Sequence, residues 1–272
     1  MGRTVDGADG HDDAQPMRGL LERLETRLDR WPAAKALLGH ASRAERATLL
    51  SIAAVAVLLA AFGFIADEVV EGETRAFDTR LMLALRTAGN PSDPVGPVWF
   101  EEMMRDFTAL GSTGVLTVMT LAVVGFLAFT RKRHAALLVA VSVAGGTLLS
   151  TLMKIGFARP RPDLVPHETI VSSASFPSGH SMMSAGVYLT LGVLLARTQA
   201  SQRVKLYILA VAAALAVLVG VSRVYLGVHW PTDVLAGWSL GAAWALGCWL
   251  AMLWLQEHGQ VEEEDGEGEG TV

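Results

Sequence analysis

The sequence predicts an all-α, polytopic membrane protein, with a six-transmembrane-helix bundle that follows an amphipathic N-terminal helix. Hydrophobic residues make up 51% of the 272 residues, and the mean hydropathy of +0.39 is too high for an ordinary soluble domain. These residues gather into six runs, each close to the roughly 20 residues that a helix needs to cross a bilayer. The runs are residues 47–66, 111–130, 135–153, 181–196, 206–222 and 234–256.

The two ends of the chain differ in composition from this bundle. Residues 1–15 are polar and lack the apolar core of a secretory signal, so we expect a disordered tail. Residues 257–272 hold seven acidic residues and no Lys or Arg, and we expect a second disordered tail there. The net charge of −5 reflects this acidic tail, so it does not indicate a nucleic-acid partner and none is predicted. The predicted parts are a tail at 1–15, an amphipathic segment at 16–46, the membrane domain at 47–256 and the acidic tail at 257–272.

The segment 16–46 contains a pattern typical of an amphipathic helix. Its apolar residues share one helical face, and its arginines lie largely elsewhere. Such a helix suits the membrane surface, which we favour, or a contact with another chain such as a second copy of this one. Pro32 should end or kink the helix. The residues of the apolar face are Met17, Leu20, Leu21, Leu24, Leu28 and Trp31.

Loop charges predict the orientation in the membrane. Six crossings place both termini on one side, and Lys and Arg accumulate in cytoplasmic loops. The loops 131–133 and 197–205 are basic and contain no acidic residue. We therefore predict a multi-pass protein of the cell membrane (plasma or inner) with both termini in the cytoplasm. The other loops face outward.

The first outward segment, 67–106, is long and rich in acidic residues. Phe77, Leu81, Met82 and Leu85 share a helical face, so we expect a short helix at the outer interface. The prolines that follow, from position 91 onward, break the pattern. The basic residues of the other outward segments oppose the charge trend and are therefore candidates for function. They are Lys154, Arg159, Arg161 and Arg223.

The stretch 222–233 places an arginine, a histidine and an aspartate between two apolar runs. Pro231 fits the first turn of the helix that follows, which puts Asp233 near the third helical position. There Asp233 could complement the helix dipole and bond a free backbone N–H. Alternatively, Asp233 could accept a hydrogen bond from His229 and leave the other ring nitrogen free to act as a nucleophile or base. Taken alone, the stretch favours the first interpretation, but two further stretches reverse that preference.

One of these stretches contains Lys154 and Arg161. A lysine at the end of a membrane helix is common, because it complements the helix dipole and reaches the interface. The run Arg159-Pro160-Arg161-Pro162 is more informative. Prolines hold the backbone extended and direct guanidinium groups, which suits forked hydrogen bonding to a phosphate.

The other stretch, residues 177–180, has the sequence Pro-Ser-Gly-His and opens the fourth apolar run. A small residue and a glycine at a helix start let a phosphate approach free backbone N–H groups. Ser178 could equally be a helix cap and Gly179 a turn residue. His180 would lie beside such an anion site, where it can protonate a leaving oxygen.

Together these stretches resemble the three-part signature of the type 2 phosphatidic acid phosphatase superfamily. Its parts are Lys-x6-Arg-Pro, Pro-Ser-Gly-His and Ser-Arg-x5-His-x3-Asp, and their order and spacing match. The signature covers residues 154–233, and the six-crossing plan extends the resemblance to about 47–256. Arg159 is not a signature position, and its role is left open.

The resemblance implies a metal-independent phosphatase that needs no cofactor and acts on a lipid phosphate through a phosphohistidine. His229 would attack phosphorus, Asp233 would orient it, and His180 would protonate the departing lipid oxygen and then activate water. The expected phosphate-binding residues are Lys154, Arg161, Ser178, Gly179 and Arg223. Electrostatic stabilisation and positioning are the main needs of phosphoryl transfer.

Alternatives come from two other classes of protein. The superfamily also contains vanadium haloperoxidases, but six bilayer-length runs and no large soluble domain argue against one here. An anion-binding transporter or channel would carry charges deep inside its crossings, whereas these charges cluster at the outer edge. Phosphatidate, phosphatidylglycerol phosphate and undecaprenyl diphosphate remain open as substrates. Cys248 lies inside an apolar run and is interpreted as a small buried hydrophobic residue.

Overall fold

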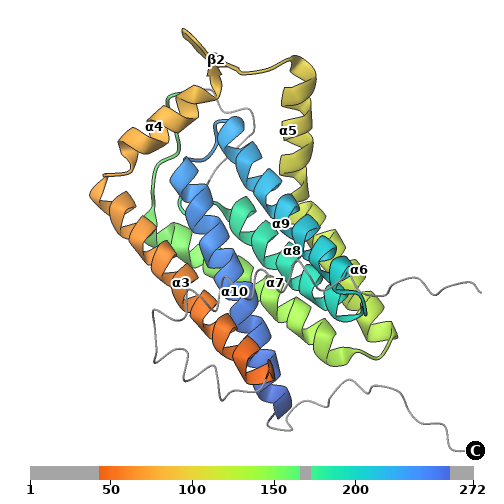
Figure 1. Ribbon diagram of the computed structural model, residues 1–272. Helices are drawn as coiled ribbons and strands as arrows, with labels where there is room; N and C mark the ends of the chain where they lie inside the picture. The colour runs from red at the N-terminus through yellow and green to blue at the C-terminus, as the bar shows by residue number, and fades with distance from the viewer. Residues whose placement is uncertain (1–42, 166–172, 258–272) are drawn as a thin grey trace, which may run out of the picture. The chain divides into compact units, whose positions relative to one another are not determined.

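The computed structural model describes residues 43–165 and 173–257 (Figure 1). The chain divides into two units, residues 1–50 and 51–272. Only the beginning of one helix is described in the first unit, and the helix bundle belongs to the second. The predicted tail at 1–15, the amphipathic helix of the segment 16–46 and the acidic tail lie outside the described residues, except for a few residues at the ends of the first and last helices.

Eight helices and one two-stranded antiparallel sheet form the described part of the chain. The sheet is a short hairpin that joins two of the helices. In order, the elements are α3 (Arg43–Glu71), α4 (Arg75–Ala84), β1 (Arg86–Thr87), β2 (Asn90–Pro94), α5 (Val98–Leu110), α6 (Thr113–Phe129), α7 (Arg133–Phe157), α8 (Gly179–Arg197), α9 (Gln202–Tyr225) and α10 (Pro231–Glu257).

The helices confirm the predicted all-α membrane fold. By length and composition, α3, α7, α8, α9 and α10 could each cross a membrane. The predicted crossing at 111–130 differs, because α6 has 17 residues and reaches the required length only together with α5, from which it is bent by 47°. The described part of the chain thus has five candidate spans, or six if the bent pair counts as one. The predicted number of six crossings stays a prediction.

The segment 67–106, which we predicted to face outward, is more structured than the sequence pattern predicts. The expected interfacial helix is present as α4, but its buried side chains are Asp78 and Met82. Phe77 and Leu81 are 51% and 42% exposed, so the protein itself covers only part of the predicted apolar face. The reason is that polar contacts of Asp78 with the start of α10 decide which side of α4 is buried. The hairpin and α5 had no counterpart in the predicted pattern.

Helix α8 lies at the centre of the bundle. It packs against α7, α9 and α10 (Figure 1), and its buried apolar side chains include Met182, Ala185 and Val187. Glycines let α10 approach it closely. A Cβ added at Gly241 would lie 2.2 Å from the Met182 carbonyl oxygen, and one at Gly237 would lie 2.7 Å from the Ser178 carbonyl oxygen. The backbones of α8 and α10 are therefore nearly in contact.

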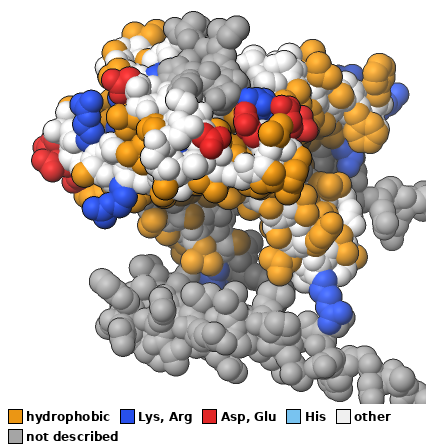
Figure 2. Space-filling model, turned by 90° about the horizontal axis from the view of Figure 1, so that it is seen from above, with side chains coloured by type: hydrophobic (Ala, Val, Ile, Leu, Met, Phe, Trp, Pro, Cys, Tyr) orange, Lys and Arg blue, Asp and Glu red, His pale blue; other side chains and the backbone are white. Residues whose placement is uncertain are grey.

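This antiparallel packing brings four helix ends together. α7 and α9 end where α8 and α10 begin, and the connections between α6 and α7 and between α8 and α9 lie at the opposite end of these helices (Figure 1). The β1–β2 hairpin, α4 and α5 lie beyond the same four ends. Viewed from that side, acidic and basic side chains are exposed among hydrophobic ones (Figure 2).

The close approach of α8 and α10 generates a stability prediction. We expect Gly241→Ala to lower the unfolding midpoint of the purified protein in detergent, because the new methyl group would force the two backbones apart. Overpacking of this kind typically costs about 1–3 kcal/mol. Gly247→Ala is the matched control on the same helix, because nothing lies within 4 Å of its added Cβ. Equal midpoints for the two variants would contradict the packing described here.

Candidate active site

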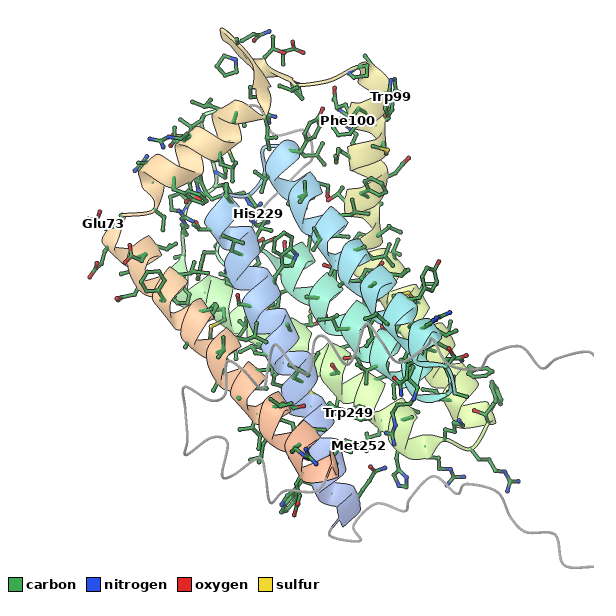
Figure 3. All side chains as sticks on the ribbon, in the orientation of Figure 1. Glu73, Trp99, Phe100, His229, Trp249 and Met252 are labelled. Atoms are coloured by element: carbon green, nitrogen blue, oxygen red, sulfur yellow. The ribbon has the colours of Figure 1, made fainter. Side chains whose placement is uncertain are left out.

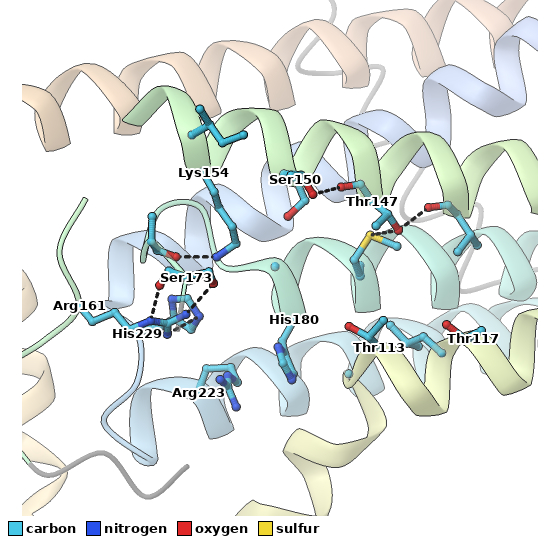
Figure 4. Close-up of a pocket in the computed structure, with 18 residues that line it drawn as sticks. Thr113, Thr117, Thr147, Ser150, Lys154, Arg161, Ser173, His180, Arg223 and His229 are labelled. Atoms are coloured by element: carbon cyan, nitrogen blue, oxygen red, sulfur yellow. Dashed lines mark hydrogen bonds between the residues drawn. The ribbon is translucent and has the colours of Figure 1, made fainter. Parts of the chain in front are cut away.

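A cavity of about 650 Å³ opens where the four helix ends meet. All three predicted stretches contribute side chains to it. Lys154, Arg161, His180, Arg223 and His229 point into the cavity from different segments (Figure 4). The sequence positions that the spacing singled out are thus neighbours in space.

His229 lies at the start of α10 (Figure 3) and its side chain is almost completely buried. Its Nδ1 is 3.3 Å from Asp233 Oδ2, and its Nε2 is 3.3 Å from Arg161 Nη1. If Nδ1 carries the proton and donates it to the carboxylate, the lone pair of Nε2 faces the cavity. This arrangement suits a nucleophile.

Asp233 lies behind His229 and is fully buried. Its Oδ2 accepts hydrogen bonds from the Trp230 backbone N–H at 2.9 Å and from the Ser175 hydroxyl, in addition to the contact with His229. α10 begins at Pro231, as predicted. The carboxylate therefore makes both contacts considered from the sequence, because it bonds a backbone N–H before the first helical turn and also contacts the imidazole.

Lys154 and Arg161 also line the cavity. Lys154 Nζ donates to the Ala174 carbonyl at 2.7 Å. Arg161 donates to the Ser173 carbonyl at 2.8 Å and to the Val228 carbonyl at 2.7 Å. These backbone acceptors hold the two cations in place while both still line the cavity.

Arg223 extends from the last turn of α9 and is buried. Its Nη1 donates to Thr108 Oγ1 at 2.8 Å. Its Nε is buried and has no hydrogen-bond partner among the described residues. A buried donor without a partner is costly, and a bound anion in the adjacent cavity would supply an acceptor near this guanidinium.

The start of α8 supplies Gly179 and His180 to the cavity wall. A side chain at position 179 would touch the Lys154 Cε and the Ser150 Oγ, each 3.4 Å from the added Cβ. Glycine thus leaves the helix N-terminus open. Ser178 is fully buried and is not among the lining residues. Its hydroxyl accepts from the Ser181 backbone N–H at 3.4 Å, so it caps α8, as the simpler interpretation of this residue has it.

Burial and local charges tune the groups of the site that lie between the helices. Burial lowers the pKa of His229 to about 4, although the hydrogen bond with Asp233 opposes the change. The imidazole is therefore neutral near pH 7, as a nucleophile must be. Burial also lowers the pKa of Arg161, and the charge of Asp233 opposes this effect.

The sequence analysis did not identify several residues of the site. Ser175 bonds Asp233 and lies two positions before the Pro-Ser-Gly-His stretch, so proximity to that motif was the available signal. Thr108 of α5 bonds Arg223, and Asp78 of α4 reaches Arg159, but no local pattern marks either. Among residues 43–165 and 173–257, no group of three or more His, Cys, Asp or Glu side chains is arranged to hold a metal ion. Cys248 is half-buried on α10.

The buried imidazole–carboxylate pair, three cations and an open helix N-terminus at one end of a membrane-helix bundle define a phosphate-handling membrane enzyme. A sequence model of the PAP2 superfamily matches residues 135–257. The chain is 40% identical over 146 residues to phosphatidylglycerophosphatase B of Bacillus subtilis, and the alignment covers 53% of this chain and 70% of that protein. The chain belongs to the PAP2 superfamily and is a PAP2-type lipid phosphatase.

Further relatives agree with this assignment. An undecaprenyl-diphosphatase of Sulfolobus acidocaldarius is 33% identical over 135 residues, which make up 48% of this chain and 58% of that protein. The crystal structure of a transmembrane PAP2-type phosphatidylglycerolphosphate phosphatase from Bacillus subtilis superposes with a TM-score of 0.64 at 31% identity. That alignment covers 75% of this chain and 96% of the other.

Proposed function

We propose that this enzyme removes the terminal phosphate of phosphatidylglycerol phosphate, or of a similar lipid phosphomonoester, through a phosphohistidine on His229. The observation that carries the proposal is the position of His229. One ring nitrogen faces the cavity beside Arg161, and the other contacts the buried carboxylate of Asp233.

The phosphate would lie among the cations. Lys154, Arg161 and Arg223 line the cavity on different sides, and together they offset the negative charge that phosphoryl transfer redistributes over the oxygens. The N–H groups at the start of α8, beginning with Gly179, would bind a further oxygen. Ser178 would support this site by capping the N-terminus of α8, next to the bound phosphate.

In the first step, the Nε2 lone pair of His229 attacks phosphorus and forms the N–P bond. The bond from phosphorus to the lipid oxygen breaks, and that oxygen takes a proton from the imidazolium of His180 as it leaves. The bound phosphate brings negative charge that favours this protonated form of His180. Asp233 balances the positive charge that develops on the His229 ring.

In the second step, His180 is neutral and can accept a proton. It takes one from a water molecule whose oxygen attacks phosphorus, so that the N–P bond breaks and its electron pair returns to His229. Inorganic phosphate leaves, and His180 is again an imidazolium. The two histidines thus have different tasks, and no metal ion takes part in the cycle.

The remainder of the cavity suits a lipid. Beyond the cations it is lined by side chains of α6, α7 and α8, which include the apolar Leu116, Val143 and Met183 and the threonines Thr113, Thr117 and Thr147. A cavity that continues from a phosphate site along partly apolar helix faces fits a substrate with an acyl tail and an anionic head group. The glycerophosphate lipid is favoured over undecaprenyl diphosphate because the relative named for it is more similar over more of its length.

We also propose that the cavity opens to the outer side of the cell membrane and that both termini are cytoplasmic. The basic residues 131–133 and 197–205 lie at the ends of α6 to α9 that are remote from the cavity. Lys and Arg in short loops accumulate on the cytoplasmic side, which supports this orientation.

The substrate assignment is tested with purified protein in detergent and a panel of lipids. Phosphate release should be fastest from phosphatidylglycerol phosphate, and slower from phosphatidate and undecaprenyl diphosphate. Activity should survive a chelator, because no step uses a metal, and vanadate should inhibit, because it imitates pentacoordinate phosphorus. Preference for the diphosphate would reassign the substrate, and loss of activity in chelator that a divalent metal restores would overturn the mechanism.

The division of tasks between the histidines is tested by substitution. His229→Ala should abolish turnover and covalent labelling by substrate phosphate. His180→Ala should slow hydrolysis of the lipid phosphate far more than hydrolysis of p-nitrophenyl phosphate. The reason is that the lipid alkoxide is a poor leaving group, whereas the phenoxide needs little protonation. Rapid quenching and parallel steady-state assays measure both effects. Equal losses on the two substrates, or labelled phosphate on the His229→Ala protein, would refute the assignment.

Orientation is tested by cysteine labelling in intact cells, with Cys248 replaced by Ala. Asp93 of β2 and Arg131 after α6 are both exposed in the structure, so a cysteine at either position is accessible to a reagent on its own side. An impermeant reagent should label the cysteine at 93 and reach the one at 131 only after lysis. The reverse result would invert the proposed topology.

A further inference from the structure

Arg159, which is not a signature position, bridges two buried carboxylates behind the proposed nucleophile. Its Nη1 lies 2.5 Å from Asp233 Oδ1, and its Nη2 lies 2.8 Å from Asp78 Oδ2. Both aspartate side chains are 0% exposed and that of Arg159 is 13% exposed. The guanidinium is therefore largely shielded from solvent, and each of its two terminal nitrogens meets a different carboxylate.

Other groups fix the position of this guanidinium. Its Nη1 also donates to Thr232 Oγ1 at 2.9 Å, and its Nη2 donates to Thr74 Oγ1 at 3.2 Å. One face lies over the ring of Trp230, with Cζ 5.5 Å from the ring centroid. Arg159 thus has a single well-defined orientation, set by the start of α4 and the start of α10.

Asp78 is held as firmly as Arg159. It accepts hydrogen bonds from the Thr232 backbone N–H at 3.0 Å and from the Thr232 hydroxyl at 2.7 Å. These bonds attach α4 to the first turn of α10, the same turn that carries Asp233. A buried aspartate with three donors from this turn and from Arg159 is a component of the site, although it does not line the cavity.

We propose that Arg159 and Asp78 are positioning residues for the phosphatase reaction. Arg159 fixes the carboxylate of Asp233 so that its Oδ2 points at His229. Asp78 offsets the positive charge of Arg159, so that Arg159 does not neutralise the negative charge of Asp233. This inference rests on the proposed function, because it acts through the His229–Asp233 pair.

The charges explain why two carboxylates are needed. Asp233 paired with Arg159 alone would carry no net charge and would balance an imidazolium poorly. With Asp78 the three side chains carry a net charge of −1. Among the described residues, the other charged groups that face His229 are cationic or can become so, namely Arg161 and Arg223, with Lys154 and His180 on the same cavity.

The test compares Asp78→Asn, Arg159→Gln and Arg159→Lys. Each should slow the formation of phosphohistidine by about 10²-fold, as displacement of a reacting group does. The loss should be the same for a short-chain lipid phosphate and for p-nitrophenyl phosphate, because the attacking group is affected and not the leaving group. Rapid-quench labelling with ³²P substrate measures this step.

The pH dependence separates positioning and charge from a general structural defect. The acid limb of kcat/KM for the free enzyme reports the protonation of His229. Asp78→Asn removes a negative charge, destabilises the imidazolium and should move this limb to lower pH. Arg159→Gln removes a positive charge and should move it to higher pH. Arg159→Lys keeps the positive charge but loses the two-pronged guanidinium. The acid limb of kcat/KM should therefore stay near that of the wild type, while phosphohistidine formation becomes slower.

Matched controls remove the same charges nearby. Arg80 of α4 and Asp93 of β2 are exposed. Arg80→Gln and Asp93→Asn should change neither the rate of phosphohistidine formation nor the acid limb of kcat/KM. Vanadate inhibition of each variant reports whether the cationic cavity is intact. If Arg159→Gln does not fold, the Asp78→Asn and Arg159→Lys pair gives the same comparison.

The outcomes distinguish this inference from the proposed function. Absence of any phosphohistidine in the wild type would refute the proposed mechanism itself. If the wild type forms it normally but Asp78→Asn and Arg159→Gln shift the acid limb in the same direction or not at all, the positioning role is refuted and the mechanism stays in place.

Discussion

The arrangement of the site depends on one backbone hydrogen bond, from the Ser178 N–H to the Asp233 carbonyl oxygen at 2.9 Å. It joins the residue that caps α8 to the first turn of α10. His180 follows one partner and His229 precedes the other, so this bond sets how far apart the two histidines lie. The glycines at 237 and 241 make the bond possible, because only a bare backbone lets the two helices come so close.

The polar groups of the site are costly in an apolar protein, and the structure compensates most of them locally. Asp233 is fully buried but accepts from a backbone N–H, a hydroxyl and a guanidinium. Arg223 has one donor matched by a threonine and another unmatched among the described residues. Asp233 is thus fully matched by the protein, whereas Arg223, which lines the cavity, keeps a donor that no described residue matches.

The sequence predicted those features that leave a local pattern. Hydropathy marked the apolar helices, and Pro231 marked the start of α10, because both depend on residues close in the chain. The three-part signature grouped the cavity residues by their order and spacing alone. The side of α4 that the protein buries could not be predicted from the sequence, since it depends on Asp78, which bonds a residue 154 positions away. Arg159 was noticed for its charge, but its contacts could not be read from spacing.

Arg161 shows what such tethering means for binding. Its guanidinium already donates to carbonyl oxygens of two different segments, those of Ser173 and Val228, so its rotamer is set when the protein folds and not when the ligand arrives. Ordering a long side chain on binding typically costs about 0.5–1.5 kcal/mol. In a preorganised cavity this entropy has been lost in advance, and the full attraction of the cation for an incoming anion is available to affinity.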